Sequence, residues 1–384
     1  NMEAPPKAQI VELIKASTSI LILTHQDPDG DAIGSALALQ LALEKMGKKP
    51  EVVFSGQVDE TFQFLPGFSG AKRSLVLGND LVVTVDTRQT GEELRLGYRK
   101  FPSEHRVKIV ITAPKGTLSA DDLRIERQGA KYDLLIILDT ASSKLLGSIY
   151  EENPDLFYET PTVAIDHHQT NGQFAKINWV DITATSTAEM LVSLIESLGR
   201  DEPILDGAIA TNLLTGLIGD TGSFQNLNTT PKSLTVAAQL VAAGADHQEI
   251  LRRTKARTLP SLKLWGKALE HLTEEPLHRF IWTTISLADA KSLGVDAGGY
   301  GLIDELLKNV GGVDFVAVLT EKEEGWVNVT LRSVEPVFDV SQLAKEMGGG
   351  GHKPAAGFRF DGTLAQQGEQ IINQLRSYQT RAGH

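Results

Sequence analysis

Short apolar runs alternate with amphipathic stretches along the first part of the chain. Four runs have the composition of buried strands, at residues 20–23, 49–56, 131–140 and 160–168. Residues 31–46 between the first two carry apolar side chains at helical spacing, and Gly47 follows as a C-terminal cap. Residues 143–157 are predicted as a helix with its exit loop. This alternation favours an α/β fold with a parallel sheet covered on both faces, which binds ligands beyond the carboxyl ends of its strands.

Residues near 81–130 interrupt this rhythm. Short strand-like runs separated by polar turns lie at residues 80–87, 106–113 and 122–127. We therefore expect a hairpin-rich insertion. A surface elaboration is favoured over a functional flap, and a dimer contact stays open as a third interpretation.

Helical patterns return after the insertion, at residues 186–198, 205–218 and 231–244. A polar helical stretch interrupted by Pro260 then resembles a linker, and strands restart at residues 279–287, 313–321 and 326–333 with two helices and a glycine-rich loop at 347–358. The predicted organisation is an N-terminal catalytic α/β domain, a linker helix and a smaller C-terminal α/β domain, at residues 1–250, 251–278 and 279–384.

The composition is that of a globular protein, with 384 residues, 41% hydrophobic and 22% charged. The absence of cysteine excludes disulfides and thiolate metal sites, and it favours a reducing cytoplasm as the location. No apolar stretch approaches the length of a membrane span, so we expect no membrane partner. The net charge of −12 argues against binding to long duplex nucleic acid. It leaves a phosphate substrate open, because metal ions can reverse the sign of one cleft.

The segment THQDPDGDAIGS, residues 24–35, concentrates acidic charge directly after the first predicted strand. His25, Asp27 and Asp29 alternate, and in an extended backbone such positions point to one side. Unpaired carboxylates this close repel one another, and a divalent cation would remove the repulsion. For this segment alone, a metal site and a solvated acidic turn are about equally good interpretations.

Carboxylates and imidazoles also follow the other strands of the same predicted sheet. Asp139 ends the apolar run ILD, the triplet Asp166-His167-His168 ends TVAID, and Asp220 follows an apolar helix within GDTG. Helix capping or an ordinary turn would explain each one singly, but not their joint occurrence. The candidate metal ligands are His25, Asp27, Asp29, Asp139, His167 and Asp220. Six ligands exceed one tetrahedral site and suit two metals with a bridging carboxylate, and the oxygen and imidazole donors favour Mn²⁺, with Mg²⁺ as the alternative.

Two features of the C-terminal domain have the chemistry of anion-binding groups. The run GGGGHK at 348–353 offers backbone N–H groups, with His352 and Lys353 as further donors. Arg332 ends the strand NVTLRS. Taken singly, a flexible turn and an exposed edge-strand arginine would explain them. In a second domain that faces a di-metal cleft, Arg332 and the glycine-rich run would bind the substrate.

With these motifs assembled, the chain resembles the DHH phosphoesterase family, in the two-domain form that carries a DHH-associated domain. The motifs HQDPDGDAIGS, ILD, IDHH, GDTGSF and GGGGH occur in family order. The resemblance implies a two-Mn²⁺ phosphodiester hydrolase in which Asp139 bridges the metals. It further implies that His25 and Asp27 bind one metal and that Asp29, His167 and Asp220 bind the other. Asp31, Asp166 and His168 would orient these ligands or contact the phosphate. The terminal phosphate or nucleotide would be bound by Arg332, Gly349, Gly350, Gly351 and His352.

Compact members of this kind degrade very short RNA such as pApA and dephosphorylate 3′-phosphoadenosine 5′-phosphate, and relatives cleave cyclic di-AMP. The resemblance therefore implies a short-RNA or dinucleotide substrate, with a cyclic di-AMP phosphodiesterase and a non-catalytic nucleotide sensor as alternatives. A homodimer stays open. Two departures from the family pattern concern the substrate, namely Gln225, where many relatives have arginine, and the insertion at 81–130.

Overall fold

The computed structural model divides the chain into two compact units, Asn1–Lys255 and Ala256–His384. The structure describes residues 4–75, 77, 81–91, 93–127, 132–296, 301–303, 307, 310–323, 325–334 and 338–382. The division falls inside the expected linker at 251–278. None of the helices within these ranges combines the length and the hydropathy that crossing a bilayer requires.

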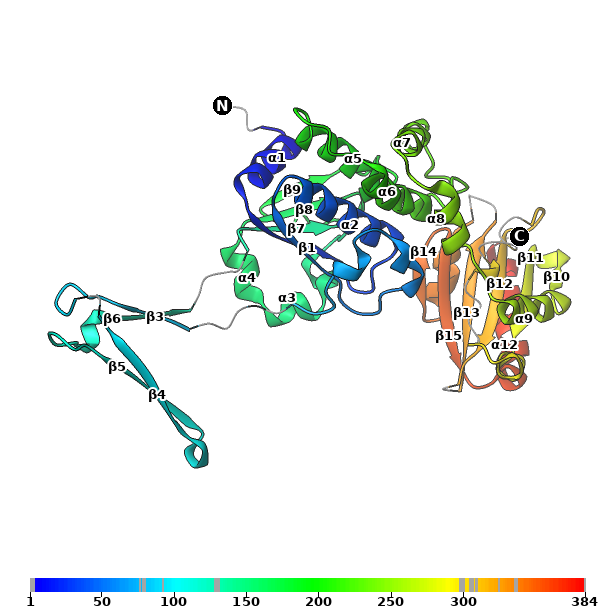
Figure 1. Cartoon of the computed structure of the whole chain (residues 1–384). Coiled ribbons are helices and arrows are strands. Elements are labelled where there is room, and N and C mark those ends of the chain that lie inside the picture. Colours follow the sequence, from blue (N-terminus) through cyan, green and yellow to red (C-terminus); the bar gives the residue numbers. More distant parts are fainter. Residues whose placement is uncertain are drawn as a thin grey trace. The chain divides into compact units, whose positions relative to one another are not determined.

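The first unit is built on a five-stranded parallel sheet with the order β2-β1-β7-β8-β9 (Figure 1). Its strands are β1 (Ser19–Thr24), β2 (Lys49–Val53), β7 (Leu134–Leu138), β8 (Thr162–Asp166) and β9 (Ile177–Val180). The first four confirm the sequence prediction. The sequence does not predict β9, because its four residues are only half-buried and form no apolar run.

Helices cover both faces of this sheet, as the unbroken apolar strands β1, β7 and β8 require. One face carries α1 (Pro6–Ala16), α2 (Gly30–Lys45), α5 (Thr187–Leu198) and α6 (Gly207–Asp220), with α7 (Pro231–Ala242) and α8 (His247–Thr254) joining the same core. The other face carries the shorter α3 (Ser148–Glu152) and α4 (Pro154–Glu159). Alternate strand residues supply the two cores: Ile20 and Ile22 face α2, whereas Leu21 and Leu23 face α3.

The helices α2 and α6 cross closely because glycine lies at their contact. A Cβ added at Gly34 would lie 2.3 Å from the carbonyl oxygen of Asn212, and one added at Gly216 would lie 2.5 Å from Oδ1 of Asp31. Only a residue without a side chain fits at these positions. This close crossing places the first turn of α2 beside the last turns of α6, where Asp220 ends the helix.

The insertion forms two antiparallel ribbons, as expected for a hairpin-rich segment. β3 (Leu81–Val85) pairs with β6 (Leu123–Arg127), and β4 (Arg95–Phe101) pairs with β5 (Arg106–Thr112). β4 is an addition to the strands that the sequence predicts. Residues 92 and 128–130 of the expected insertion lie outside the described ranges.

The second unit is built on a six-stranded mixed sheet with the order β10-β11-β12-β13-β15-β14. The strands are β10 (Thr273–Glu275), β11 (Phe280–Ile285), β12 (Phe315–Glu321), β13 (Trp326–Ser333), β14 (Gly350–His352) and β15 (Ala355–Asp361). α9 (Leu259–Glu270) and α10 (Leu287–Leu293) share one core with the sheet, and α11 (Val340–Glu346) and α12 (Leu364–Ala382) share another. This is an α/β unit with more than the two helices that the sequence predicts.

One local expectation for the second unit is confirmed and another is wrong. The helical stretch is interrupted next to Pro260, because α8 ends at Thr254 and α9 begins at Leu259, with Pro260 in the first turn of α9, where its missing N–H costs nothing. The apolar face of α9 packs into the core that it shares with α10 through Leu264 and Trp265. Residues 347–358 are not wholly a loop, because β14 and β15 pair there. Glycine weakens strands in general, but a Cβ at Gly351 would lie 2.5 Å from Cα of Ala356, so the close pairing requires it.

Candidate metal and phosphoester site

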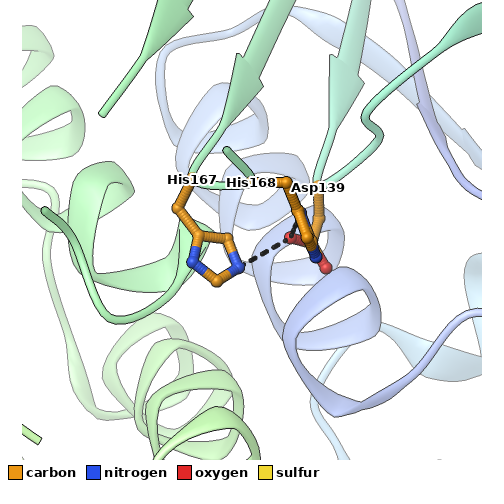
Figure 2. Close-up of side chains that lie close together, drawn as sticks. All are labelled: Asp139, His167 and His168. Carbon is orange, nitrogen blue, oxygen red and sulfur yellow. Dashed lines mark ion pairs between the residues drawn. The ribbon is translucent and has the colours of Figure 1, made fainter. Parts of the chain in front are cut away.

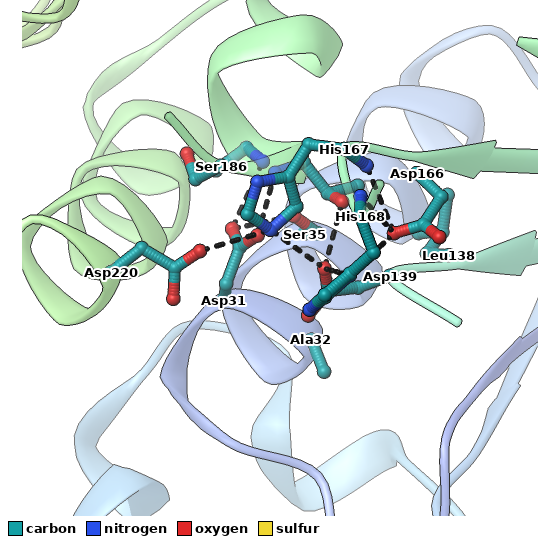
Figure 3. Close-up of polar contacts among 12 residues, drawn as sticks. Asp31, Ala32, Ser35, Leu138, Asp139, Asp166, His167, His168, Ser186 and Asp220 are labelled. Atoms are coloured by element: carbon teal, nitrogen blue, oxygen red, sulfur yellow. Dashed lines mark hydrogen bonds and ion pairs between the residues drawn. The ribbon is translucent and has the colours of Figure 1, made fainter. Parts of the chain in front are cut away.

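Histidine and aspartate side chains converge at the carboxyl edge of the parallel sheet, where β1, β7 and β8 end (Figure 3). In the described part of the chain they form three groups whose donor atoms lie within 4.8 Å of one another. The groups are Asp139 with His167 and His168, His25 with Asp29 and Asp139, and Asp31 with His167 and Asp220. The structure thus brings together most of the ligands expected from the sequence, from segments nearly 200 residues apart.

Asp139 lies between two of these groups. It follows β7 with a left-handed backbone (φ 53°), and its side chain is 2% exposed. Its Oδ1 lies 3.4 Å from Nε2 of His167, and its Oδ2 lies 3.8 Å from Nε2 of His25 (Figure 2 shows the first contact). The two oxygens of one carboxylate therefore point to different imidazoles, which is the arrangement that a bridging ligand needs.

Thr187 holds this carboxylate in place. Its hydroxyl donates a 2.9 Å hydrogen bond to Oδ1 of Asp139, and its backbone N–H donates to Oδ2 of Asp31 at 2.6 Å. The sequence analysis does not identify Thr187. The pattern Ser186-x-x-Glu189 marks the start of α5, but only the fold shows that this first turn faces the site.

Asp31 is fully buried in the first turn of α2 and accepts hydrogen bonds at the N-terminus of α5. Ala188 donates its backbone N–H to Oδ1 at 2.9 Å, and Ser35 donates its hydroxyl to the same oxygen at 3.3 Å. Burial, with the carboxylates of Asp139 and Asp220 adding to it, raises the pKa of Asp31 well above its ordinary value. A positive charge in the site would remove this penalty.

His167 lies closest to the carboxylate of Asp220, with 3.1 Å between Nε2 and Oδ2 (Figure 3). Burial alone would lower the pKa of His167, but the carboxylates of Asp139, Asp220 and Asp31 around it raise the pKa to about 11. Although Nε2 is buried, it makes no hydrogen bond of acceptable geometry within the described residues. A buried ring nitrogen aimed between carboxylate oxygens fits a divalent cation, for which these donor atoms are suitable ligands.

Asp166 orients the two histidines that follow it. Its Oδ1 accepts the backbone N–H of His167 at 2.9 Å and the ring Nδ1–H of His168 at 2.8 Å, and its Oδ2 accepts an N–H of Asn171 at 2.7 Å. Burial would raise the pKa of Asp166, but these hydrogen bonds outweigh burial and hold the pKa below its ordinary value. Asn171 is a second contributor that the sequence analysis does not identify, since a lone asparagine in a loop carries no signal.

The first motif departs from the expected geometry. Asp27 has a left-handed backbone (φ 55°), so the segment from His25 to Asp29 is not extended, and the expectation that its alternate side chains share one side is wrong at Asp27. Oδ1 of Asp27 accepts the backbone N–H of Gln57 at 2.5 Å, and Asp27 belongs to none of the three groups. Asp29 lies with His25 instead of His167, and its Oδ1 also caps α2 through the N–H groups of Asp31 and Ala32.

The segment after Asp220 has an unusual backbone. Gly222, Ser223 and Phe224 all have a left-handed conformation, with φ values of 56°, 60° and 66°. Left-handed residues other than glycine are strained, and such strain is typical of functional sites. Asn226 and Asn228 secure the turn by donating to the carbonyl oxygen of Asp220, at 3.0 Å and 3.2 Å. Gln225 follows on the exposed side.

The expected phosphate-binding residues lie in the second unit. Arg332 is on β13, an interior strand that pairs with β12 and β15, so it is not an edge-strand residue. Gly350 and Gly351 are on β14, which forms the edge of the sheet, and Gly349 precedes it. A Cβ at Gly349 would lie 2.1 Å from the carbonyl oxygen of Gly357, so packing alone accounts for this glycine. The backbone of His352 ends β14, and its side chain lies outside the described part of the chain.

Comparison with known families identifies this arrangement. The family described as the DHH family, N-terminal domain, matches residues 19–217, which is just over half of the chain. This chain belongs to the DHH family. The DHHA1 domain, the associated domain of the family, matches residues 285–380 in the second unit. The DHH triplet is Asp166-His167-His168, and it lies at the centre of the site.

Several relatives of this DHH chain match nearly its whole length. It is 31% identical over 381 residues to a bifunctional oligoribonuclease and PAP phosphatase NrnA from Thermus thermophilus, covering 98% of this chain and 95% of that protein. It is 25% identical over 379 residues to the cyclic-di-AMP phosphodiesterase GdpP from Geobacillus thermodenitrificans, but spans only 48% of that protein. Among solved structures, an exopolyphosphatase-related protein from Bacteroides fragilis matches with a TM-score of 0.74 and 22% identity, covering 99% of this chain and 98% of that one, which shows the shared fold.

Proposed function

We propose that this chain is a metal-dependent phosphodiesterase that hydrolyses very short oligonucleotides such as pApA, with 3′-phosphoadenosine 5′-phosphate as a further substrate. The observation that carries the proposal is the position of Asp139, whose two carboxylate oxygens point to His167 and to His25. The near-complete match in length to the Thermus NrnA supports the substrate class.

The site has enough ligands for two cations, which we assign as Mn²⁺ with Mg²⁺ as the alternative. His25 and Asp29 would hold one cation together with Oδ2 of Asp139, and His167 and Asp220 would hold the other together with Oδ1. When bound, two such cations lower the pKa of a coordinated water and neutralise charge on the phosphoryl group. We also assign Asp27 to the first cation. Its Oδ1 accepts the backbone N–H of Gln57, which leaves Oδ2 to bind the cation.

The remaining polar residues of the site position these ligands. Thr187 links the first turn of α5 to Asp139 at the end of β7, Asp31 links the same turn to α2, and Asp166 accepts hydrogen bonds from both histidines. Misplacement of ligands by even small distances weakens metal binding, so these residues are as necessary as the ligands. His168, which is half exposed at 47%, is available to contact a phosphate.

We assign the recognition of the terminal phosphate or nucleotide to the second unit. Arg332, Gly349, Gly350, Gly351 and His352 are the residues proposed for it. Within the described part of the chain, one side of the edge strand β14 has no strand partner, so the N–H groups on that side can bind an anion.

Cyclic di-AMP is the second candidate substrate, because the chain also resembles GdpP over 96% of its own length. A non-catalytic nucleotide sensor is disfavoured, because sensors commonly lose a ligand and all six candidates are present here.

The proposal is tested by product analysis with the purified full chain and Mn²⁺. The substrates to compare are pApA, a longer 5′-phosphorylated RNA, cyclic di-AMP and 3′-phosphoadenosine 5′-phosphate. Faster turnover of pApA than of cyclic di-AMP supports the short-RNA assignment. A preference for cyclic di-AMP would replace it with the second candidate, and absence of turnover of all four with metal bound would favour the sensor.

A further inference from the structure

The ribbon formed by β4 and β5 has two chemically different faces. Side chains alternate between faces along a strand, and directly paired residues share a face. In the observed register, Leu96 and Tyr98 share one face with their partners Ile111 and Ile109. The opposite face carries Arg95, Arg99 and Phe101 of β4, with Arg106 and Lys108 of β5. The first face is mainly apolar, although Lys100 also lies on it, and the opposite face holds the other four basic side chains of the two strands together with Val110 and Thr112.

The charge of this ribbon is opposite to that of the chain. Residues 95–112 contain five basic side chains and one acidic side chain, Glu104, in a protein whose net charge is −12. Glu104 pairs with Arg106. Arg95, Arg99 and Lys108 are exposed, and within the described ranges none of them forms an ion pair. The basic face therefore carries three charges without a carboxylate partner.

Arg99 and Lys108 are directly opposite each other in the ladder. Like charges in a directly opposed pair destabilise a two-stranded ribbon, which is already only marginally stable in water. A ribbon that retains this pair is expected to meet a polyanion that neutralises both charges. The guanidinium of Arg99 also lies 5.7 Å from the ring centroid of Phe101, which places an aromatic ring beside the charges.

We propose that the basic face of the β4–β5 ribbon binds single-stranded RNA longer than the dinucleotide that the hydrolytic site takes. Cationic grooves combined with aromatic rings are the usual means by which proteins hold single strands without sequence preference. The inference rests on the proposed function for the choice of RNA as the polyanion. It assigns the insertion a role in retaining substrate between successive cleavages, separate from the metal site.

The test compares two double variants that remove equal charge from the same insertion. Arg99→Gln/Lys108→Gln removes the opposed pair on the basic face. Lys100→Gln/Lys115→Gln is the control, because Lys100 lies on the apolar face beside Tyr98 and Lys115 lies outside both strands. Since the first variant relieves a repulsion, the ribbon is not expected to unfold.

Binding is measured by fluorescence anisotropy with a labelled 2′-O-methyl phosphorothioate RNA of about a dozen nucleotides, which resists hydrolysis, on the full chain with Mn²⁺. For a single strand, each lost phosphate contact reduces the slope of log K against log salt concentration by about 0.7. The basic-face variant loses two such contacts, so it should bind more than tenfold more weakly at about 0.1 M salt. The control should bind as the wild type does, and both variants should hydrolyse pApA at the wild-type rate.

Unchanged RNA binding by the basic-face variant would overturn the proposal, and so would equal losses in both variants, which would indicate an effect of net charge. Loss of pApA hydrolysis in the basic-face variant would overturn it too, because the ribbon would then belong to the active site. Binding to vesicles of acidic phospholipid through the same residues, without RNA binding, would contradict RNA as the partner. If the wild type binds the long RNA through this face but does not hydrolyse pApA, the proposed function fails and the ribbon assignment stands.

Discussion

The hydroxyl of Thr187 donates a 2.9 Å hydrogen bond to the carboxylate of Asp139, 48 positions away in the sequence. This contact joins the first turn of α5 to the end of β7. It aims Oδ1 at His167 and leaves Oδ2 toward His25. The position of the proposed bridging ligand therefore depends on a side chain that coordinates nothing itself.

Replacing Thr187 with valine should weaken metal binding while leaving the fold intact. Valine has the same shape but no hydroxyl, and the backbone N–H that binds Asp31 is retained. Loss of a residue that orients a metal ligand typically costs about tenfold to a hundredfold in affinity or activity. Calorimetric titration with Mn²⁺ measures the change. Thr187→Ser, which keeps the hydroxyl, should bind metal nearly as the wild type does, and equal affinities for the valine and serine variants would contradict this role.

Gly216→Ala should destabilise the protein and disturb the site together. The new Cβ would lie 2.5 Å from Oδ1 of Asp31 and 2.8 Å from Cβ of Ala188, so α2 and α6 must separate or Asp31 must move. Overpacking of this kind costs about 1–3 kcal/mol. Gly266→Ala is the matched control, since a Cβ there meets no heavy atom within 4 Å, and alanine in the interior of α9 should stabilise it by up to about 1 kcal/mol. Urea unfolding of both variants measures these changes. Similar free energies of unfolding for Gly216→Ala and Gly266→Ala would show that the helix crossing tolerates the methyl group.

Asp166→Asn should lower the free energy of unfolding by about 1–3 kcal/mol, because the new amide NH₂ group would face the N–H donor of either His168 or Asn171. The hydrogen bonds hold the pKa of Asp166 below its ordinary value. Its contribution is therefore fully present above the unfolded pKa and is lost as pH falls through the lower, folded pKa. Asp206→Asn is the control. Asp206 caps α6 at a half-exposed position where asparagine caps equally well, so this variant loses only an exposed ion pair with Lys45, which is worth at most about 1 kcal/mol. A larger loss at Asp206 than at Asp166 would contradict the expectation.

Without divalent cations, the stability of the protein should fall as pH rises through the range in which Asp220 ionises. Burial and the charges of Asp139 and Asp29 raise the pKa of Asp220 from 3.8 to about 6, against the lowering effect of His167. A raised pKa gives a contribution that is fully present below the unfolded pKa and is lost as pH rises through the folded pKa. For this shift the loss is at most about 3 kcal/mol. Thermal unfolding in chelator should show a steeper fall for the wild type than for Asp220→Asn, and parallel curves would refute the assignment.

Much of the fold follows from patterns that the sequence carries locally. The strands β1, β7 and β8 contain unbroken apolar runs, β2 ends in the apolar pair Val52-Val53, and the helix after β1 ends where Gly47 permits a left-handed turn. β9 and β14 are different, because one is half-buried and the other consists mostly of glycine, so neither has a strand pattern. Their pairing partners, β8 and β15, determine them.

In the candidate site, too, some positions follow from the sequence and others depend on contacts that only the fold creates. The positions of Asp139 and Asp166 follow from their place at the ends of buried strands, since parallel strands bring their carboxyl ends to one edge. The left-handed backbone at Asp27 does not follow, because it depends on the contact of Asp27 with Ser55 and Gln57 after β2. The role of Thr187 could also be found only from the structure, because it depends on which residues the start of α5 faces.

The existence of a two-cation hydrolytic site bridged by Asp139 is tested most directly by metal content and turnover in one preparation. The full chain and its Asp139→Asn variant are dialysed against Mn²⁺, analysed for manganese per chain, and assayed with pApA. We expect two manganese ions per wild-type chain and rapid hydrolysis, with fewer ions bound and hydrolysis lost in the variant, whose amide cannot bridge two cations. Wild-type metal content and turnover in Asp139→Asn would contradict the assignment of Asp139 as the bridge.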